Sequence, residues 1–185
     1  VQVAEGALNE THSILQRMNE LATQAANDTN TSTDRTAIQA EIDQLTSEIN
    51  RIQSTTQFNT MNLLDGTFSS KNLQVGSLSG QSIGISIKNM NASSLGVDAL
   101  KVSSFASAGS SMDKIQSAIN LVSTQRSTLG ALQNRLEHTI NNLNTTAENT
   151  QAAESRIRDV DMATEMVEYS KNNILAQAGQ SMLAQ

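Results

Sequence analysis

The chain has 185 residues and a formal net charge of −6, and its composition excludes several classes of protein. Cysteine is absent, which excludes a disulfide framework and thiolate metal sites. The 12 lysines and arginines are scattered, so we expect no nucleic-acid binding, and no run of about 18 apolar residues is present to span a membrane. Aromatic residues make up 2% and proline is absent, so we expect a thin aliphatic core between long uninterrupted helices.

The first segment predicts an amphipathic helix over about residues 1–27. Its apolar residues recur at intervals of three and four from Ala4 to Ala25, which places them in one stripe. A polar cluster over residues 27–32 then favours a turn, because Asn, Asp, Ser and Thr side chains compete for backbone hydrogen bonds. Ser32 or Thr33 is the predicted N-cap of the next helix, with Asp34 in its first turn.

The second segment predicts a helix over about residues 34–54 that needs a partner. Its apolar positions follow the 4, 3, 4, 3 spacing of a heptad seam, and they are Ile38, Ile42, Leu45, Ile49 and Ile52. The first helix, folded back antiparallel across the polar loop, is the predicted partner.

The helical period is lost between residues 55 and 109. Asp65-Gly66 predicts a turn, and two alternating runs predict a β-hairpin over about residues 72–88, with a Gly-containing loop at 76–80. We interpret residues 89–109, which are rich in Ser, Ala and Asn, as irregular, with one short strand near Leu100–Val102.

The longest predicted helix covers about residues 111–150. Ser110 and Asp113 have the spacing of a capping box at its start. Its stripe continues the predicted helix-seam core, at Ile115, Ile119, Val122, Leu129, Leu136, Ile140 and Leu143. The predicted fold class is mainly α: a long antiparallel helical bundle or coiled-coil rod with a small β-hairpin subregion.

Residues 156–185 form a weaker final stripe that contains small and flexible residues, including three methionines. Its main apolar positions are Ile157, Val160, Val167, Ile174 and Met182. A segment of this kind is poorly specified alone, and we expect it to pack only after assembly.

No residue pattern indicates an enzyme, a metal site or a bound cofactor. His12 and His138 are the only histidines, and neither has ligand partners at metal spacing. Asp159 and Asp161 lie two positions apart, so on a helix they do not face each other as a general acid and base. A self-associating structural protein is therefore the predicted class, and a non-polymerising helical module that binds a receptor or acts as an adhesin is the alternative.

Several runs resemble bacterial flagellin, in particular the flagellins of Bacillus and related Gram-positive bacteria. At the N-terminal side these runs are Glu5–Glu10, Leu15–Ala25, Gln39–Ile42 and Thr56–Asn59 leading to Leu63–Gly66. At the C-terminal side they are Leu129–Leu136 and Ala153–Ala163. The resemblance runs in order along nearly the whole chain.

The resemblance implies a structural subunit of the flagellar filament, which serves motility. It assigns residues 1–155 to the family's core domain and 156–185 to part of the coiled terminal segment. The family's N-terminal coiled segment is missing before Val1 and its outer variable domains are missing after the hairpin, so we expect a truncated flagellin that is monomeric in isolation. The implied location is the extracellular filament, reached through the flagellar export channel without a cleaved signal peptide.

The resemblance also implies three partners: other flagellin subunits, Toll-like receptor 5 and a cytoplasmic export chaperone. The positions that match the receptor-contact motif are Gln16, Arg17, Glu20, Leu21, Gln24 and Glu41, with Asn134 and Arg135 as lesser contacts. Asn19 and Thr23 depart from the family motif, which usually has Arg and Val there. The chaperone is expected to capture the final stripe over Ile157–Gln185.

Overall fold

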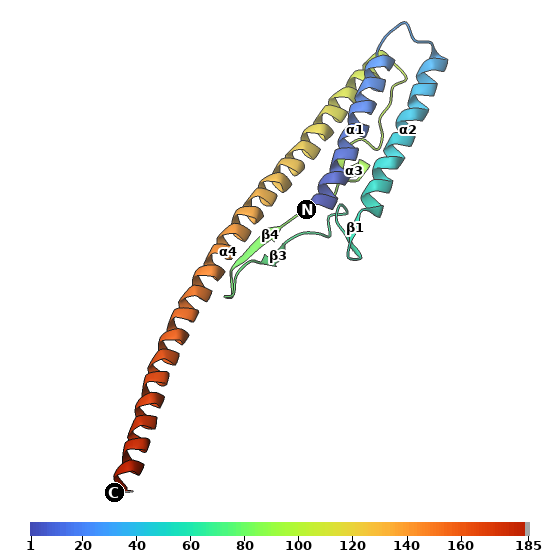
Figure 1. The fold of residues 1–185 in the computed structure, drawn as a ribbon. Helices are drawn as coiled ribbons and strands as arrows, with labels where there is room; N and C mark the ends of the chain where they lie inside the picture. The colour runs from blue at the N-terminus through green and yellow to red at the C-terminus, as the bar shows by residue number, and fades with distance from the viewer. Residues whose placement is uncertain (184–185) are drawn as a thin grey trace. The chain divides into compact units, whose positions relative to one another are not determined.

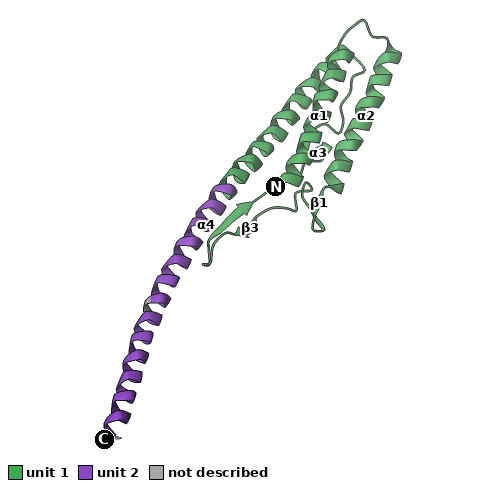
Figure 2. Cartoon of the chain, viewed as in Figure 1, with its two compact units in different colours: residues 1–136 green, residues 137–185 purple. Residues whose placement is uncertain are grey.

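The computed structural model describes residues 1–183, except for the side chain of Val160. The chain forms two compact units, Val1–Leu136 and Glu137–Gln185 (Figure 2). The first unit holds three helices and two small antiparallel strand pairs, together with the first part of a fourth helix (Figure 1). The second unit is the remainder of that fourth helix. The predicted fold class, long helices with a small hairpin, is confirmed.

Helices α1 (Gln2–Ala25) and α2 (Ser32–Thr55) pack against each other with the chain reversed between them, as the seam predicts (Figure 1). The N-cap of α2 is Thr31, so the expectation of Ser32 or Thr33 is wrong. Thr31 Oγ1 accepts from the backbone N–H of Asp34 at 3.2 Å, and Asp34 Oδ2 accepts from the N–H of Thr31 at 2.9 Å. Asp34 is the third residue of the helix, and in a capping box the side chain at this position bonds the residue three positions earlier. That residue is Thr31, which is therefore the N-cap.

Arg35 ties the end of α1 to the start of α2. Its Nε donates to the carbonyl oxygen of Ala25 at 3.1 Å, and its Nη2 donates to Asp28 Oδ1 at 3.2 Å. The carbonyl groups in the last turn of a helix have no partner within the helix. The guanidinium therefore satisfies one of these groups and fixes the loop that reverses the chain.

Two strand pairs follow α2. The predicted hairpin is confirmed as β3 (Lys71–Gln74) and β4 (Ser82–Ile85), with Leu73 opposite Ile83. A smaller pair that the sequence did not predict, β1 (Gln57–Phe58) and β2 (Met61–Asn62), is joined by Asn59 and Thr60, both with positive φ. Two successive left-handed residues give the turn twist that a two-residue hairpin needs, but Thr is rarely found there, so pattern alone missed it.

Residues 92–102 differ from the sequence expectation. They contain a short helix, α3 (Ala92–Leu95), whose N-cap Asn91 accepts from the N–H of Ser94 at 2.7 Å. Residues 100–102 are not a strand. The amide of Gln39 donates to the carbonyl oxygen of Leu100 and accepts from the N–H of Val102, each at 3.0 Å. One side chain of α2 thus supplies the two bonds that a neighbouring strand would otherwise make.

We predict that Gln39→Ala lowers the free energy of unfolding by about 1–3 kcal/mol, because it leaves two partly buried backbone groups without partners. Urea denaturation followed by circular dichroism measures this change. Gln44→Ala is the control, since Gln44 is exposed on the same helix. Equal effects of the two substitutions would show that the Gln39 bonds contribute nothing to stability.

Helix α4 (Phe105–Leu183) begins earlier than the expected residue 111, and Ser110 does not cap it. Ser104 and Ser107 cap it instead: Ser104 Oγ accepts from the N–H of Ser107 at 3.2 Å, and Ser107 Oγ accepts from the N–H of Ser104 at 2.9 Å. The helix continues through residue 150 without a break, so the predicted helix over 111–150 and the final stripe, as far as residue 183, lie on one helix. The domain boundary expected after residue 155 stays a prediction.

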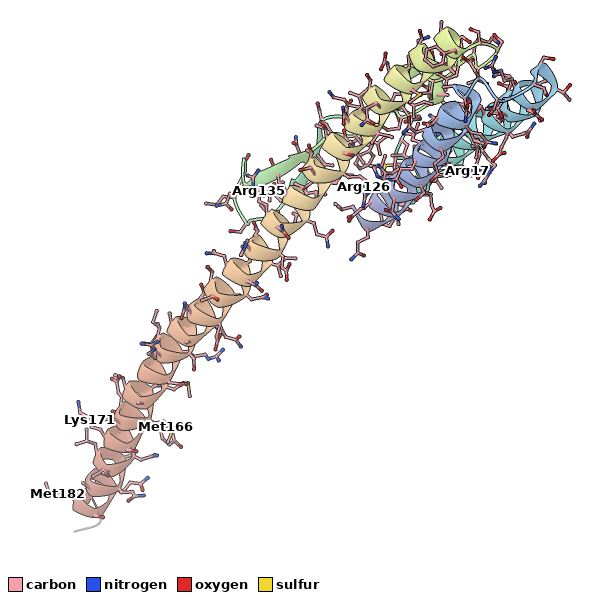
Figure 3. All side chains as sticks on the ribbon, turned by 90° about the horizontal axis from the view of Figure 1, so that it is seen from above. Arg17, Arg126, Arg135, Met166, Lys171 and Met182 are labelled. Atoms are coloured by element: carbon pink, nitrogen blue, oxygen red, sulfur yellow. The ribbon has the colours of Figure 1, made fainter. Side chains whose placement is uncertain are left out.

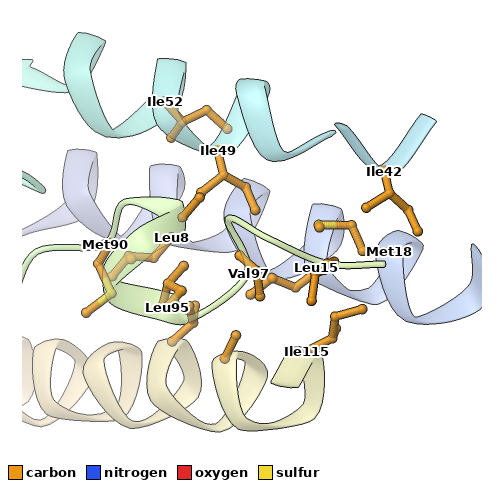
Figure 4. Packing of buried hydrophobic residues seen from close by; sticks show 14 of the residues in the cluster. Leu8, Leu15, Met18, Ile42, Ile49, Ile52, Met90, Leu95, Val97 and Ile115 are labelled. Atoms are coloured by element: carbon orange, nitrogen blue, oxygen red, sulfur yellow. The ribbon is translucent and has the colours of Figure 1, made fainter. Parts of the chain in front are cut away.

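The core of the first unit lies between α1, α2, α3 and α4 (Figure 4). Its predicted seam residues Ile38, Ile42, Ile49, Ile52, Ile115, Val122 and Leu129 are buried, and Leu45, Ile119 and Leu136 are partly buried. The assignment of Ile140 and Leu143 to a buried seam is wrong for this chain, because they are 57% and 39% exposed. Both lie in the second unit, which consists of one helix.

Three carboxyl groups of the first unit accept hydrogen bonds that favour their charged form. Hydrogen bonds lower the pKa of Asp34 through Thr31, of Glu48 through Arg51, and of Asp65 through Thr67. A lowered folded-state pKa gives stability that is fully present above the ordinary carboxyl values of 3.8 and 4.5 and is lost as the pH falls through the folded values. We predict that the urea concentration at the unfolding midpoint decreases as the pH is lowered from about 5 to 3. The triple change Asp34→Asn, Glu48→Gln, Asp65→Asn should make this pH dependence weaker. An unaltered dependence would contradict the assignment.

Candidate interaction surfaces

Arg17, Glu20 and Glu41 form a charged cluster that joins α1 to α2. Arg17 Nη2 and Nε donate to Glu41 Oε1 at 2.9 and 3.0 Å, and Arg17 Nη1 donates to Glu20 Oε2 at 3.2 Å. The bond with Glu41 and then the bond with Glu20 raise the pKa of the Arg17 guanidinium. All three side chains are exposed, and exposed ion pairs contribute little to stability. The cluster therefore presents an ordered set of charges at the surface.

The other predicted receptor contacts on α1 divide between the surface and the core. Gln16 and Gln24 are exposed, and Gln16 bonds His12. Leu21 is 2% exposed, so it does not share the exposed surface of Arg17 and Gln24. Leu21 follows Met18 by three positions and precedes Ala25 by four, which places it in the buried stripe of α1.

Asn134 and Arg135 are exposed on α4. Arg135 lies beside β4, where it lines a surface hollow of about 280 Å³ with Gly84, Ile85 and Leu132. Arg17 and Arg135 thus project from different helices (Figure 3). Of the eight predicted receptor positions, direct bonds bring together Arg17, Glu20 and Glu41.

An open apolar cavity of about 370 Å³ lies at the start of α1. Side chains from five elements line it: Val3 of α1, Phe58 of β1, Leu73 of β3, Ile85 of β4 and Leu129 of α4 are among them. Val3, Phe58 and Leu73 are exposed there. The first unit therefore has an apolar surface at the start of α1.

The second unit exposes apolar side chains on two faces of α4. Ile157, Val167, Ile174 and Met182, four of the predicted stripe positions, are exposed on one face, and the side chain of Val160 lies outside the described residues. Met162, Met166 and Tyr169 are exposed and lie at three- and four-residue spacing on the opposite face. Figure 3 shows Met166 on the other side of the helix from Lys171 and Met182. A helix with apolar residues on opposite faces is typical of one that is covered on both sides.

The described residues contain no group of three or more His, Cys, Asp or Glu side chains placed to hold a metal ion. Within residues 1–183, no helix is long and apolar enough to cross a membrane. Asp159 bonds Ser155, one turn earlier on the same exposed helix.

Comparison with known proteins decides the family. Residues 1–69 match the family model of the bacterial flagellin N-terminal helical region, and residues 112–185 match that of the C-terminal helical region. The chain is 52% identical to a flagellin of Halalkalibacterium halodurans over 187 residues, which covers 100% of this chain and 69% of that protein. The chain belongs to the flagellin family.

Other flagellins agree. A flagellin of Bacillus subtilis is 49% identical over 220 residues, covering 100% of this chain and 72% of that protein. The crystal structure of Bacillus cereus flagellin superposes with a TM-score of 0.68 at 34% identity, over 76% of this chain and 82% of that one. The predicted resemblance to Bacillus-type flagellins is therefore confirmed.

Flagellins are structural proteins that form the extracellular filament of the bacterial flagellum with other flagellin subunits. Family membership therefore accounts for a chain whose candidate interaction sites lie on the surfaces of its helices. The sequence did not predict that Arg17 bonds Glu20 and Glu41, although Glu41 lies in Gln39–Ile42, one of the runs that resemble flagellin. The second apolar face of α4 was not predicted either, because the apolar residues of 156–185 were assigned to a single stripe.

Proposed function

We propose that this chain is held in the filament by the two apolar faces of residues 137–183, which the same helix of neighbouring subunits covers. The observation that carries the proposal is the exposure of Ile157, Val167 and Ile174 together with Met162 and Met166. Burying one aliphatic side chain of this size contributes about 1.5–3 kcal/mol. Exposed apolar patches of this kind mark interaction sites, and a filament supplies neighbouring copies of the helix that can cover both faces.

A chimera tests this function. The region of the Bacillus subtilis flagellin that aligns with this chain is replaced by the 185 residues, and the chimera is expressed in a strain without its own flagellin. We expect filaments by electron microscopy and swimming in soft agar. A chimera that is secreted but remains unpolymerised would support the alternative, a non-polymerising binding or adhesin module.

We also propose that the Arg17 cluster is a contact for Toll-like receptor 5, as the resemblance implies. The exposed charges of Arg17, Glu20 and Glu41 support this, because Arg is frequent among residues that dominate binding. Arg17→Ala should reduce signalling in receptor reporter cells by roughly tenfold. Arg51→Ala is the matched control, since Arg51 forms an exposed ion pair with Glu48 on α2. Equal signalling by the two variants would contradict the contact.

We propose that a cytoplasmic chaperone binds the same apolar faces of residues 157–182 in a hydrophobic groove before export. The chain then leaves through the flagellar channel without a cleaved signal peptide. Exposed Met and aliphatic side chains at helical spacing suit helix-in-groove binding. Calorimetry with the Bacillus subtilis export chaperone should give one chaperone per chain. Binding that survives Ile174→Asp unchanged would exclude this surface.

A further inference from the structure

The seven methionines of the chain differ sharply in exposure. Met18 and Met90 are 0% and 3% exposed in the core, and Met112 is partly buried against it. The three methionines of the second unit are far more accessible: Met162 is 56%, Met166 is 61% and Met182 is 80% exposed. Met61, at 41%, is the remaining accessible one and lies in β2.

The three exposed methionines of α4 lie in both of its apolar faces. Met162 and Met166 are one turn apart and form one face with Tyr169. Met182 is 16 positions after Met166, about four and a half turns at 3.6 residues per turn, so it projects with Val167 and Ile174 from the opposite face (Figure 3). Each face that we propose neighbouring subunits cover therefore contains at least one exposed thioether.

We propose that Met162, Met166 and Met182 are reversible sulfur-oxidation sites that control assembly, an inference that rests on the proposed filament function. A peroxide transfers one oxygen atom to the sulfur; the thioether loses two electrons, and hydrogen peroxide is reduced to water. The product, a sulfoxide, is polar and chiral, and methionine sulfoxide reductases return it to the thioether.

The effect of oxidation follows from where the sulfur atoms lie. In the free subunit the three side chains face solvent, so a sulfoxide there leaves the helix and the core of the first unit intact. In the filament the same oxygen must be buried against apolar neighbours, where a polar group without a hydrogen-bond partner is costly. Oxidation therefore blocks addition of free subunits, while subunits already assembled are shielded from the oxidant.

The first experiment maps oxidation in the 185-residue chain. The chain is treated with dilute hydrogen peroxide, and peptides are analysed by mass spectrometry for the gain of about 16 Da per oxygen. Met162, Met166 and Met182 should oxidise roughly tenfold faster than Met18 and Met90, with unchanged circular dichroism. Equal rates at all of these sites would overturn the assignment.

The second experiment measures assembly with the chimera defined above. Oxidised monomers should leave on the order of tenfold more protein unpolymerised than untreated monomers, and reductase treatment should restore assembly. The control carries Met162→Leu, Met166→Leu and Met182→Leu, which keeps volume and apolarity but removes the oxidisable sulfur. It should polymerise equally with and without peroxide.

The outcomes separate the two proposals. If untreated monomers do not polymerise, the proposed function fails and the assembly half of this inference falls with it, while the oxidation map stands alone. If untreated monomers polymerise and oxidised ones do so equally well, only the inference fails. Inhibition of the leucine control by peroxide would also overturn it, because the sensitive group would then lie elsewhere.

Discussion

Replacing Leu15 by alanine should lower the free energy of unfolding of the first unit by about 2–5 kcal/mol. Leu15 is fully buried on α1 and projects into the core toward Val97 and Ile115 (Figure 4). The substitution removes buried methyl groups and leaves a cavity at a point where α1, α4 and the segment after α3 meet. Urea denaturation followed by circular dichroism gives the change.

Ile140→Ala is the matched control for this experiment. Ile140 belongs to the predicted seam of residues 111–150, but it is 57% exposed in the second unit. Its substitution should change the free energy of unfolding by no more than about 0.5 kcal/mol in the monomer. A loss at Ile140 as large as that at Leu15 would show that the buried seam extends past residue 136.

Val167→Asp and Ile174→Asp, made together, should abolish polymerisation of the chimeric flagellin. Each substitution places a carboxylate in the face that neighbouring subunits cover, and burial of an unpaired charge is strongly unfavourable. We expect the concentration needed for assembly to rise by roughly a hundredfold or more. Sedimentation of filaments from a monomer dilution series measures it.

Asn172→Asp provides the control for added charge. Asn172 is exposed on the same helix, beside rather than within the apolar face, so the same carboxylate stays in solvent. This variant should assemble like the unmodified chimera, and all three proteins should give the same circular dichroism as monomers. Normal assembly of the doubly substituted protein would mean that this face is not an interface.

Periodicity was enough to predict the elements that bury a stripe. The 4, 3, 4, 3 spacing over residues 38–52 predicted α2 and its need for a partner helix, and the short polar loop before it predicted antiparallel packing on α1. Alternating residues predicted β3 and β4 in the same way. Local hydrophobic order determines these elements, and a sequence displays such order directly.

The features that sequence missed depend on partners distant in the chain. Residues 100–102 alternate like a strand, but the carbonyl of Leu100 and the N–H of Val102 bond the side chain of Gln39, more than 60 positions earlier. Leu21 lies both in the apolar stripe of the first predicted helix and in the run that matches the receptor motif, and its burial shows that it belongs to the core. Ile140 and Leu143 continue the stripe, but they are exposed in the second unit, whose described residues form one helix. A stripe shows that a face is apolar, and only the fold shows whether the same chain covers it.

The most direct test of a helix that is covered only by other subunits is backbone amide hydrogen exchange over residues 137–183. In the monomer we predict rapid exchange there and strong protection in the core of residues 1–136, because a single exposed helix opens locally at little free-energy cost. In the filament the same amides should become protected. Exchange over residues 137–183 that is equally fast in monomer and filament would contradict the proposed assembly through these faces.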